Sequence, residues 1–281
     1  MNGRNMKDMD AEELLERYSR GERDFKGVDL HWATLSGTNL SQINLSQAVL
    51  HGAFLSTEQN STCFSQANFE ETDLSEAHLS QADLRQANFH RANLCQADLS
   101  RVNLKGADLS EADLSETILI RADLSEANLS EADLSRAILT NVLLAKANIE
   151  RVNFNKADFS RTDLRGVCLG KATLSGINLS RTNLTGIDLS RKLLSGANLS
   201  SAELVQANLR NAYLIKVDLS DADLTHADLS GIKLMDANLK GANLSQAKLA
   251  DADLRGTNLT RAQLRNTYLR GAMMPDGTIH D

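Results

Sequence analysis

A large apolar residue recurs at every fifth position along most of the chain. The pattern begins at Phe25, slips by one residue between Leu55 and Phe64, and then runs to Leu269 without a gap. From Phe64 onward it comprises 42 positions, of which 36 are Leu, five Phe and one Ile. Two residues before each position stands a small or β-branched residue, with Lys192 as the one charged exception. The repeating unit therefore reads small–Asp/Asn–Leu–Ser–variable.

A period of five excludes the commonest regular structures. An α-helix repeats about every 3.6 residues and a flat strand about every two. The period instead fits a chain that turns a corner every five residues, with the large and the small residue pointing inward. One coil cannot bury its own leucines, so successive coils must stack and share a continuous core. At ~1.5–3 kcal/mol for each buried Leu, such a core outweighs the weak strand propensity of Ala, Asp, Asn and Ser.

These units resemble the pentapeptide repeat family, whose pattern is A-[DN]-L-x-x, over residues 23–274. The segment 274–281 is also similar to the tails of cyanobacterial members. The resemblance implies an all-β fold, a right-handed quadrilateral β-helix in which residues about 20 apart stack vertically. Most members of that family have no assigned activity. Some members inhibit DNA gyrase by imitating DNA, and one cyanobacterial member influences heterocyst differentiation through protein contacts.

A stack of coils needs caps, because an open end exposes the core and unpaired strand edges. Asp10 and Glu13 have the spacing of a helix capping box. They predict a short N-terminal capping helix over residues 10–20 that covers the first coil. The turn at residues 275–277, with Met273 and Met274, is expected to close the far end.

These signals divide the chain into five segments. The break in the period is interpreted as a tolerated loop, with a recognition loop or a bend between two stacks as the alternative. The segments are 1–22 with the capping helix, 23–55 with the first coils, 56–63 as the interruption, 64–274 as the main solenoid, and 275–281 as the C-terminal tail.

The charge balance disfavours general affinity for nucleic acid, with 30 basic and 37 acidic residues and a net charge of −7. One predicted surface column is a basic stripe, but no aromatic residues interleave it, so we do not expect it to bind nucleic acid directly. Residues 25–140 carry 7 Lys/Arg and 16 Asp/Glu, whereas residues 141–215 carry 10 and 5. The acidic coils keep open the alternative of a DNA-mimic inhibitor of DNA gyrase or another DNA-processing enzyme. The stripe comprises Arg101, Arg121, Arg161 and Arg181.

Apolar residues at outward positions are the stronger indication of function, because the repeat places Asp, Asn or Ser there. A contiguous apolar patch that contains an aromatic residue is typical of a protein contact. Lys192 is expected to distort its coil, since an inward ammonium must reach solvent or a carboxylate. The candidate protein-contact patch is Leu193, Tyr213, Ile215 and Met235, and a secondary patch is Ile118, Ile120 and Ile138.

The sequence contains no nucleotide-binding, hydrolase or zinc-protease motif. Cys63, Cys95 and Cys168 are interpreted as free surface thiols. His31 and His51 fall in one column, which Glu70 and His90 would join if the interruption preserves the faces, but no second shell supports a metal site there. A core filled with Leu leaves no cavity for a substrate.

The sequence therefore predicts a non-enzymatic protein without a cofactor or metal. We expect a protein-interaction module or scaffold with a regulatory role, cytoplasmic in a cyanobacterium. Its protein partner is unknown, no membrane contact is expected, and a monomer is favoured over a dimer. A passive structural spacer, which would bind nothing, is a third possibility.

Overall fold

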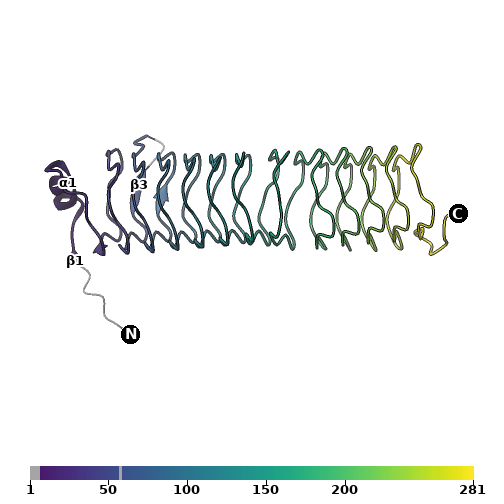
Figure 1. Cartoon of the computed structure of the whole chain (residues 1–281), viewed down its shortest axis with the longest axis horizontal. Helices are drawn as coiled ribbons and strands as arrows, with labels where there is room; N and C mark the ends of the chain where they lie inside the picture. The colour runs from purple at the N-terminus through teal and green to yellow at the C-terminus, as the bar shows by residue number, and fades with distance from the viewer. Residues whose placement is uncertain (1–6, 57–58) are drawn as a thin grey trace, which may run out of the picture. The chain divides into compact units, whose positions relative to one another are not determined.

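The computed structural model describes residues 7–56 and 59–281. The chain forms two compact units, Met1–Asn153 and Phe154–Asp281, and each is a stack of coils (Figure 1). In both units most residues at the outward Asp/Asn position form a parallel β-bridge with the residue 20 positions later, as in Asn88–Asp108 and Tyr213–Lys233. The one-coil spacing implied by the family resemblance is therefore present in each unit.

Each five-residue unit ends in a β-turn. The amide of Ala82, for example, donates to the carbonyl of Leu79 at 3.0 Å. Gln81, the third residue of this turn, has φ of 60°, and Ser80 before it is not in the left-handed region. One positive φ at the third position is the signature of a type II turn. Since a turn closes every five residues and coils bridge every 20, one coil contains four turns.

The recurrent Leu and the small residue two positions before it form the core, as the period predicts. Leu84 and Ala82 are both fully buried. Phe69 and Phe89, one coil apart, stack with ring centroids 4.8 Å apart and an interplanar angle of 6°. Like side chains thus lie directly over one another in successive coils, and each coil buries its neighbour's leucines.

The outward Asp or Asn of each unit has a structural role in the turn. Asp108 Oδ1 accepts the amide of Ser110 at 3.0 Å, and it also accepts Nδ2 of Asn128 in the next coil at 3.0 Å. A short side chain that accepts the amide two residues ahead stabilises a turn. This explains the preference for Asp and Asn. A coil with an apolar residue at this position lacks these side-chain hydrogen bonds.

The predicted capping helix is present as α1, Ala11–Ser19 (Figure 1). Asp10 Oδ1 accepts the amide of Glu13 at 2.7 Å, which satisfies one of the free amides of the first turn. Leu14 is fully buried, and the Tyr18 hydroxyl donates to the carbonyl of Ser41 at 2.8 Å. Before the helix, β1 (Lys7–Asp8) pairs in parallel with β2 (Val28–Asp29). No helix in the described ranges is long and apolar enough to cross a membrane.

The interruption adds four residues to one coil. Around it the bridged residues are 24 apart, as in Asn44–Asn68 and Val49–Asp73, and β3 (Phe54–Ser56) pairs with β4 (His78–Leu79). Residues 57–58 of the predicted interruption lie outside the described residues. Because the interruption shifts the register by four residues, Glu70 and His90 do not lie in the column of His31 and His51. His51 is followed one coil later by Ser75, whose Oγ lies 2.9 Å from His51 Nδ1.

The C-terminal tail folds back on the last strand-like segment. Met273 bridges Asp253 in parallel and Ile279 in antiparallel orientation. The amide of Met274 donates to the carbonyl of Thr278 at 2.7 Å, across the predicted turn at 275–277. This hairpin-like return follows from the Pro-Asp-Gly sequence, since Gly277 has φ of 85°.

Candidate protein-interaction face

The candidate patch lies on one face of the unit Phe154–Asp281. Leu193 and Tyr213 form a β-bridge in adjacent coils, and Tyr213 bridges Lys233 in the next. Leu193 is 68% exposed and Tyr213 46% exposed. We call the set Leu193, Tyr213, Ile215 and Met235 the Leu193 patch. It is contiguous, because its members occupy neighbouring positions in three successive coils.

Leu193 and Tyr213 stand where other coils have Asp or Asn. They cannot accept the amide two residues ahead, so the turn stabilisation that Asp108 provides is lost in these coils. Their large side chains remain in water instead of in the core. Folding alone therefore gains little from either residue, and a contact with another molecule is the simplest use of them.

Ile215 and Met235 extend the patch along the adjoining corner. Both are half-buried, and the amide of Lys216 donates to the carbonyl of Met235 at 2.9 Å. Arg255 closes this side of the patch, where its Nη2 lies 3.3 Å from Met235 Sδ. The same guanidinium forms two hydrogen bonds with Asp253, at 2.7 and 2.9 Å. These bonds hold the pKa of Asp253 below its ordinary value.

Lys192 opens the stack next to the patch. Its ammonium donates to the backbone carbonyls of Leu169, at 3.1 Å, Gly170, and Ala172, at 3.3 Å. The predicted distortion is therefore found, and three backbone carbonyls accept hydrogen bonds from the ammonium. Among the described residues the bridges that would join Cys168 to Asp188 and Thr173 to Leu193 are missing. These two coils are therefore not bridged at two consecutive five-residue units.

A groove follows from this opening. It has a volume of about 410 Å³ and lies directly beside Leu193. Leu174 forms part of its lining, together with Arg191 and Lys192. A groove lined by apolar and cationic residues thus continues the Leu193 patch toward the N-terminal end of this unit.

The secondary patch is a pair of stacked isoleucines with a neighbour at the corner. Ile118 and Ile138 form a β-bridge, and Ile120 follows Ile118 at the turn. Ile118 and Ile120 are half-buried, so this surface is smaller than the Leu193 patch. Leu143, which sequence reasoning did not include, is 56% exposed and follows Ile138 on the next side of the same coil. Its outward position in the repeat was the available signal.

A cluster of aromatic residues near the N-terminus was also missed. Trp32 is 54% exposed, and its ring lies 5.2 Å from that of His51. Phe54 stacks on His78 at 4.6 Å. Trp32 lies over Gly52, where an added Cβ would come within 2.2 Å of the ring. A glycine 20 residues after an outward tryptophan was the signal that sequence reasoning passed over.

The predicted basic stripe consists of one pair of arginines in each unit. Arg101 and Arg121 are third turn residues, with φ of 56° and 59°, in coils bridged through Asn103 and Asp123. Arg161 and Arg181 occupy the same turn position in coils bridged through Asp163 and Asn183. All four side chains are exposed.

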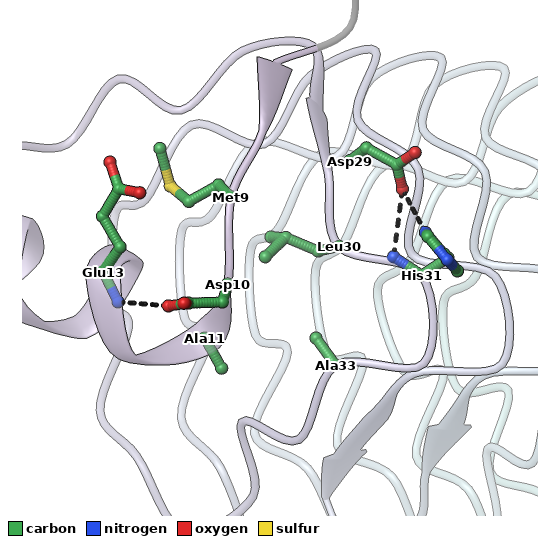
Figure 2. Close-up of a pocket in the computed structure, with 8 residues that line it drawn as sticks. All are labelled: Met9, Asp10, Ala11, Glu13, Asp29, Leu30, His31 and Ala33. Atoms are coloured by element: carbon green, nitrogen blue, oxygen red, sulfur yellow. Dashed lines mark hydrogen bonds and ion pairs between the residues drawn. The ribbon is translucent and has the colours of Figure 1, made fainter.

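A cleft at the capped end, of about 510 Å³, is lined by α1 and the first coil (Figure 2). Its carboxylates already have structural partners, since Asp10 caps the helix and Asp29 Oδ1 lies 2.7 Å from His31 Nδ1. In residues 7–56 and 59–281 no group of three His, Cys, Asp or Glu side chains is placed to hold a metal ion. Cys63 and Cys95 are half-buried free thiols and Cys168 is an exposed one. The cleft is therefore part of the cap.

Coils bridged every 20 residues, with turns every five and an apolar patch on one face, define a β-helical repeat protein. A profile of pentapeptide repeats matches the chain in eight copies. The copies cover residues 24–57, 62–101, 97–136, 137–176, 177–212, 193–231, 202–241 and 237–273. The chain belongs to the pentapeptide repeat family.

Three solved structures are similar to parts or most of this chain. HetL, a pentapeptide repeat protein involved in heterocyst differentiation regulation from the cyanobacterium Nostoc sp. strain PCC 7120, is 34% identical over 97% of this chain and 100% of its own, with a TM-score of 0.35. Rfr23 from the cyanobacterium Cyanothece 51142 is 36% identical over 39% of this chain and 88% of its own, with a TM-score of 0.36. QnrB1, a plasmid-mediated fluoroquinolone resistance protein, is 20% identical over 64% of this chain and 84% of its own, with a TM-score of 0.45. No curated protein matched the sequence.

Proposed function

We propose that this protein is a non-catalytic, regulatory protein-interaction module that binds a partner protein through the Leu193 patch. The observation that carries the proposal is the adjacent exposure of Leu193 and Tyr213, at a position where the repeat otherwise has Asp or Asn. Burial of these two side chains against a partner would remove apolar surface from water, and aromatic residues are enriched in the buried centres of interfaces. The similarity to HetL, a regulatory protein by its description, supports a regulatory role.

We further propose the finer architecture and setting that the family resemblance implies. The repeats of residues 23–55 and 64–274 wind as a right-handed quadrilateral β-helix, with residues 56–63 as an interruption and 275–281 as a tail. The protein acts in the cytoplasm of a cyanobacterium as a monomer, without a cofactor.

Inhibition of a DNA-processing enzyme by an acidic, DNA-like surface is less well supported. In the unit Met1–Asn153 three glutamates of the turns pair with arginines one coil away. Arg91 lies 2.9 Å from Glu111, Arg136 3.0 Å from Glu116, and Arg151 2.8 Å from Glu131. A line of phosphate-like charge would need these carboxylates unpaired.

The test is affinity capture from a lysate of the source organism, followed by binding measurements with the purified prey. The variant Tyr213→Asp/Ile215→Asp is compared with the native protein and with the control Ile118→Asp/Ile138→Asp, after circular dichroism shows that all three are folded. We expect a prey that the native protein and the control bind and that the Tyr213→Asp/Ile215→Asp variant loses.

Equal binding by all three proteins would contradict the proposal. If that prey were also released by moderate salt, the acidic coils of residues 25–140 would become the binding surface, because apolar contacts resist salt and charge steering does not.

A further inference from the structure

We propose that the Leu193 patch and the groove beside it take an acidic, extended segment of the partner, with one apolar side chain of that segment seated in the groove. The inference rests on the proposed function and names the chemistry of its ligand. It is carried by three features of the Leu193 face: its charge, the free backbone groups of the opened coils, and the shape of the groove.

The charge of this face is opposite to that of the chain. Residues 170–176, 190–196, 210–216 and 230–236, which carry the groove and the patch, contain six Lys or Arg and one acidic residue, Asp236, in a protein whose net charge is −7. Arg210 is paired with Asp228 at 3.1 Å, and Lys192 is occupied by carbonyls. Arg191, which lines the groove, and Lys216, beside Ile215, are exposed, and neither forms an ion pair with a carboxylate among the described residues. A partner with Asp or Glu at both ends of its contact would complement them.

The opened coils offer hydrogen bonds to an extended backbone. In a regular coil the amide of Leu174 would donate to the carbonyl of Leu193, as the amide of Leu194 does to Tyr213 at 2.8 Å. In the described structure the Leu174 amide and the Leu193 carbonyl form no hydrogen bond. Free strand-edge groups of this kind are what an added peptide strand uses.

The shape of the site favours one side chain flanked by charges. The groove of about 410 Å³ is large enough for one large side chain, and Leu174 is among its lining residues. Leu193 and Tyr213 continue the apolar surface beyond it. A nucleic-acid backbone could use the cations but not these two side chains, so an acidic polypeptide is the ligand that satisfies both.

The experiment selects ligands without assuming the partner. Phage-displayed random peptides are selected on the native protein and counter-selected on Leu193→Ser/Tyr213→Ser. We expect enriched peptides with one Leu, Ile, Phe or Met between Asp and Glu residues. For a synthetic peptide of that sequence, fluorescence anisotropy should show affinity ~10-fold weaker for Arg191→Glu, with Arg181→Glu on another face as the unchanged control.

The possible outcomes separate the two proposals. If the selected peptides need Leu193 and Tyr213 for binding but lack acidic residues, the proposal of an acidic ligand is wrong. The proposed function would still hold. Absence of any peptide that depends on these residues would overturn both. A dimer of the native protein in sedimentation equilibrium that Leu193→Ser dissociates would replace the acidic segment by a second copy of this chain.

Discussion

Nζ of Lys192 lies 3.3 Å from the carbonyl oxygen of Ala172, the atom that the amide of Leu193 would bond in a regular coil. The equivalent bond is present one coil later, where the amide of Tyr213 donates to the carbonyl of Lys192 at 2.9 Å. The Lys192 side chain thus replaces the Leu193 amide as the donor to Ala172, and the two adjacent coils are separated there. The opening beside the Leu193 patch thus coincides with one lysine at a position that the repeat assigns to Ala.

Replacement of that lysine should close the stack. In Lys192→Ala we expect the Leu193 amide to bond Ala172, the Leu174 amide to bond Leu193, and the free energy of unfolding to rise by about 1–2 kcal/mol. Hydrogen exchange checks this directly, since the Leu174 and Leu193 amides should become protected. Lys216→Ala, at an exposed turn, is the control and should change neither quantity. Unchanged exchange at Leu174 in Lys192→Ala would show that the lysine does not hold the coils apart.

Two adjacent leucines test the division between core and surface. Leu194 is fully buried, and Leu194→Ala should cost about 2–5 kcal/mol of stability, because it leaves a cavity that the stack cannot close. Leu193→Ala deletes the same side-chain atoms at an exposed position, and it should change the free energy of unfolding by less than about 0.5 kcal/mol. Chemical denaturation of both variants gives the comparison. Equal losses would mean that Leu193 packs within the protein.

The fold was predictable because one pattern is repeated across most of the chain. Each recurrent Leu, such as Leu84, has the same neighbours one coil away, so a single local rule specifies the core. The Leu193 patch was also predictable, since Leu and Tyr at an outward position break that rule.

The departures from the repeat could not be predicted in detail. The sequence identified Lys192 as a misfit, but its carbonyl partners depend on how far the coils separate. The slip between Leu55 and Phe64 fits either a shortened turn or an insertion, and only the pairing of residues 24 apart shows that four residues are added. Trp32 was overlooked because it stands at a turn position that accepts nearly any residue.

A pH-dependent pair borders the Leu193 patch. The hydrogen bonds from Arg255 lower the pKa of Asp253 relative to its ordinary value near 3.9. The pair therefore stabilises the fold above that pH, and the stabilisation is lost as pH falls through the lower pKa of the folded state. In Arg255→Gln we expect the pKa of Asp253 to rise, as measured by carboxyl NMR titration. Asp188, whose pKa is lowered by the amide and hydroxyl of Ser190, should not move.

Gly52 is expected to hold the single tryptophan in place. In Gly52→Ala the new methyl group would meet the Trp32 ring at 2.2 Å, so the ring must swing away from His51. The fluorescence of Trp32 should then shift to longer wavelength. Gly27→Ala, with φ of 68° and nothing within 4 Å of the added Cβ, is the matched control. Both variants should lose about 1 kcal/mol from the positive φ, but only Gly52→Ala should change the emission. An unchanged spectrum would mean that the ring does not rest on Gly52.

The most direct test of binding through the Leu193 patch is site-specific photo-crosslinking. The photoreactive residue p-benzoylphenylalanine replaces Tyr213 in one sample and Asn198, on the next side of the same unit, in another. After irradiation in a lysate of the source organism, we expect one discrete protein adduct at position 213 and none at 198. An excess of the unlabelled native protein should abolish it, and an excess of Leu193→Ser should not. Equal labelling at both positions, or none at 213, would contradict the proposed function.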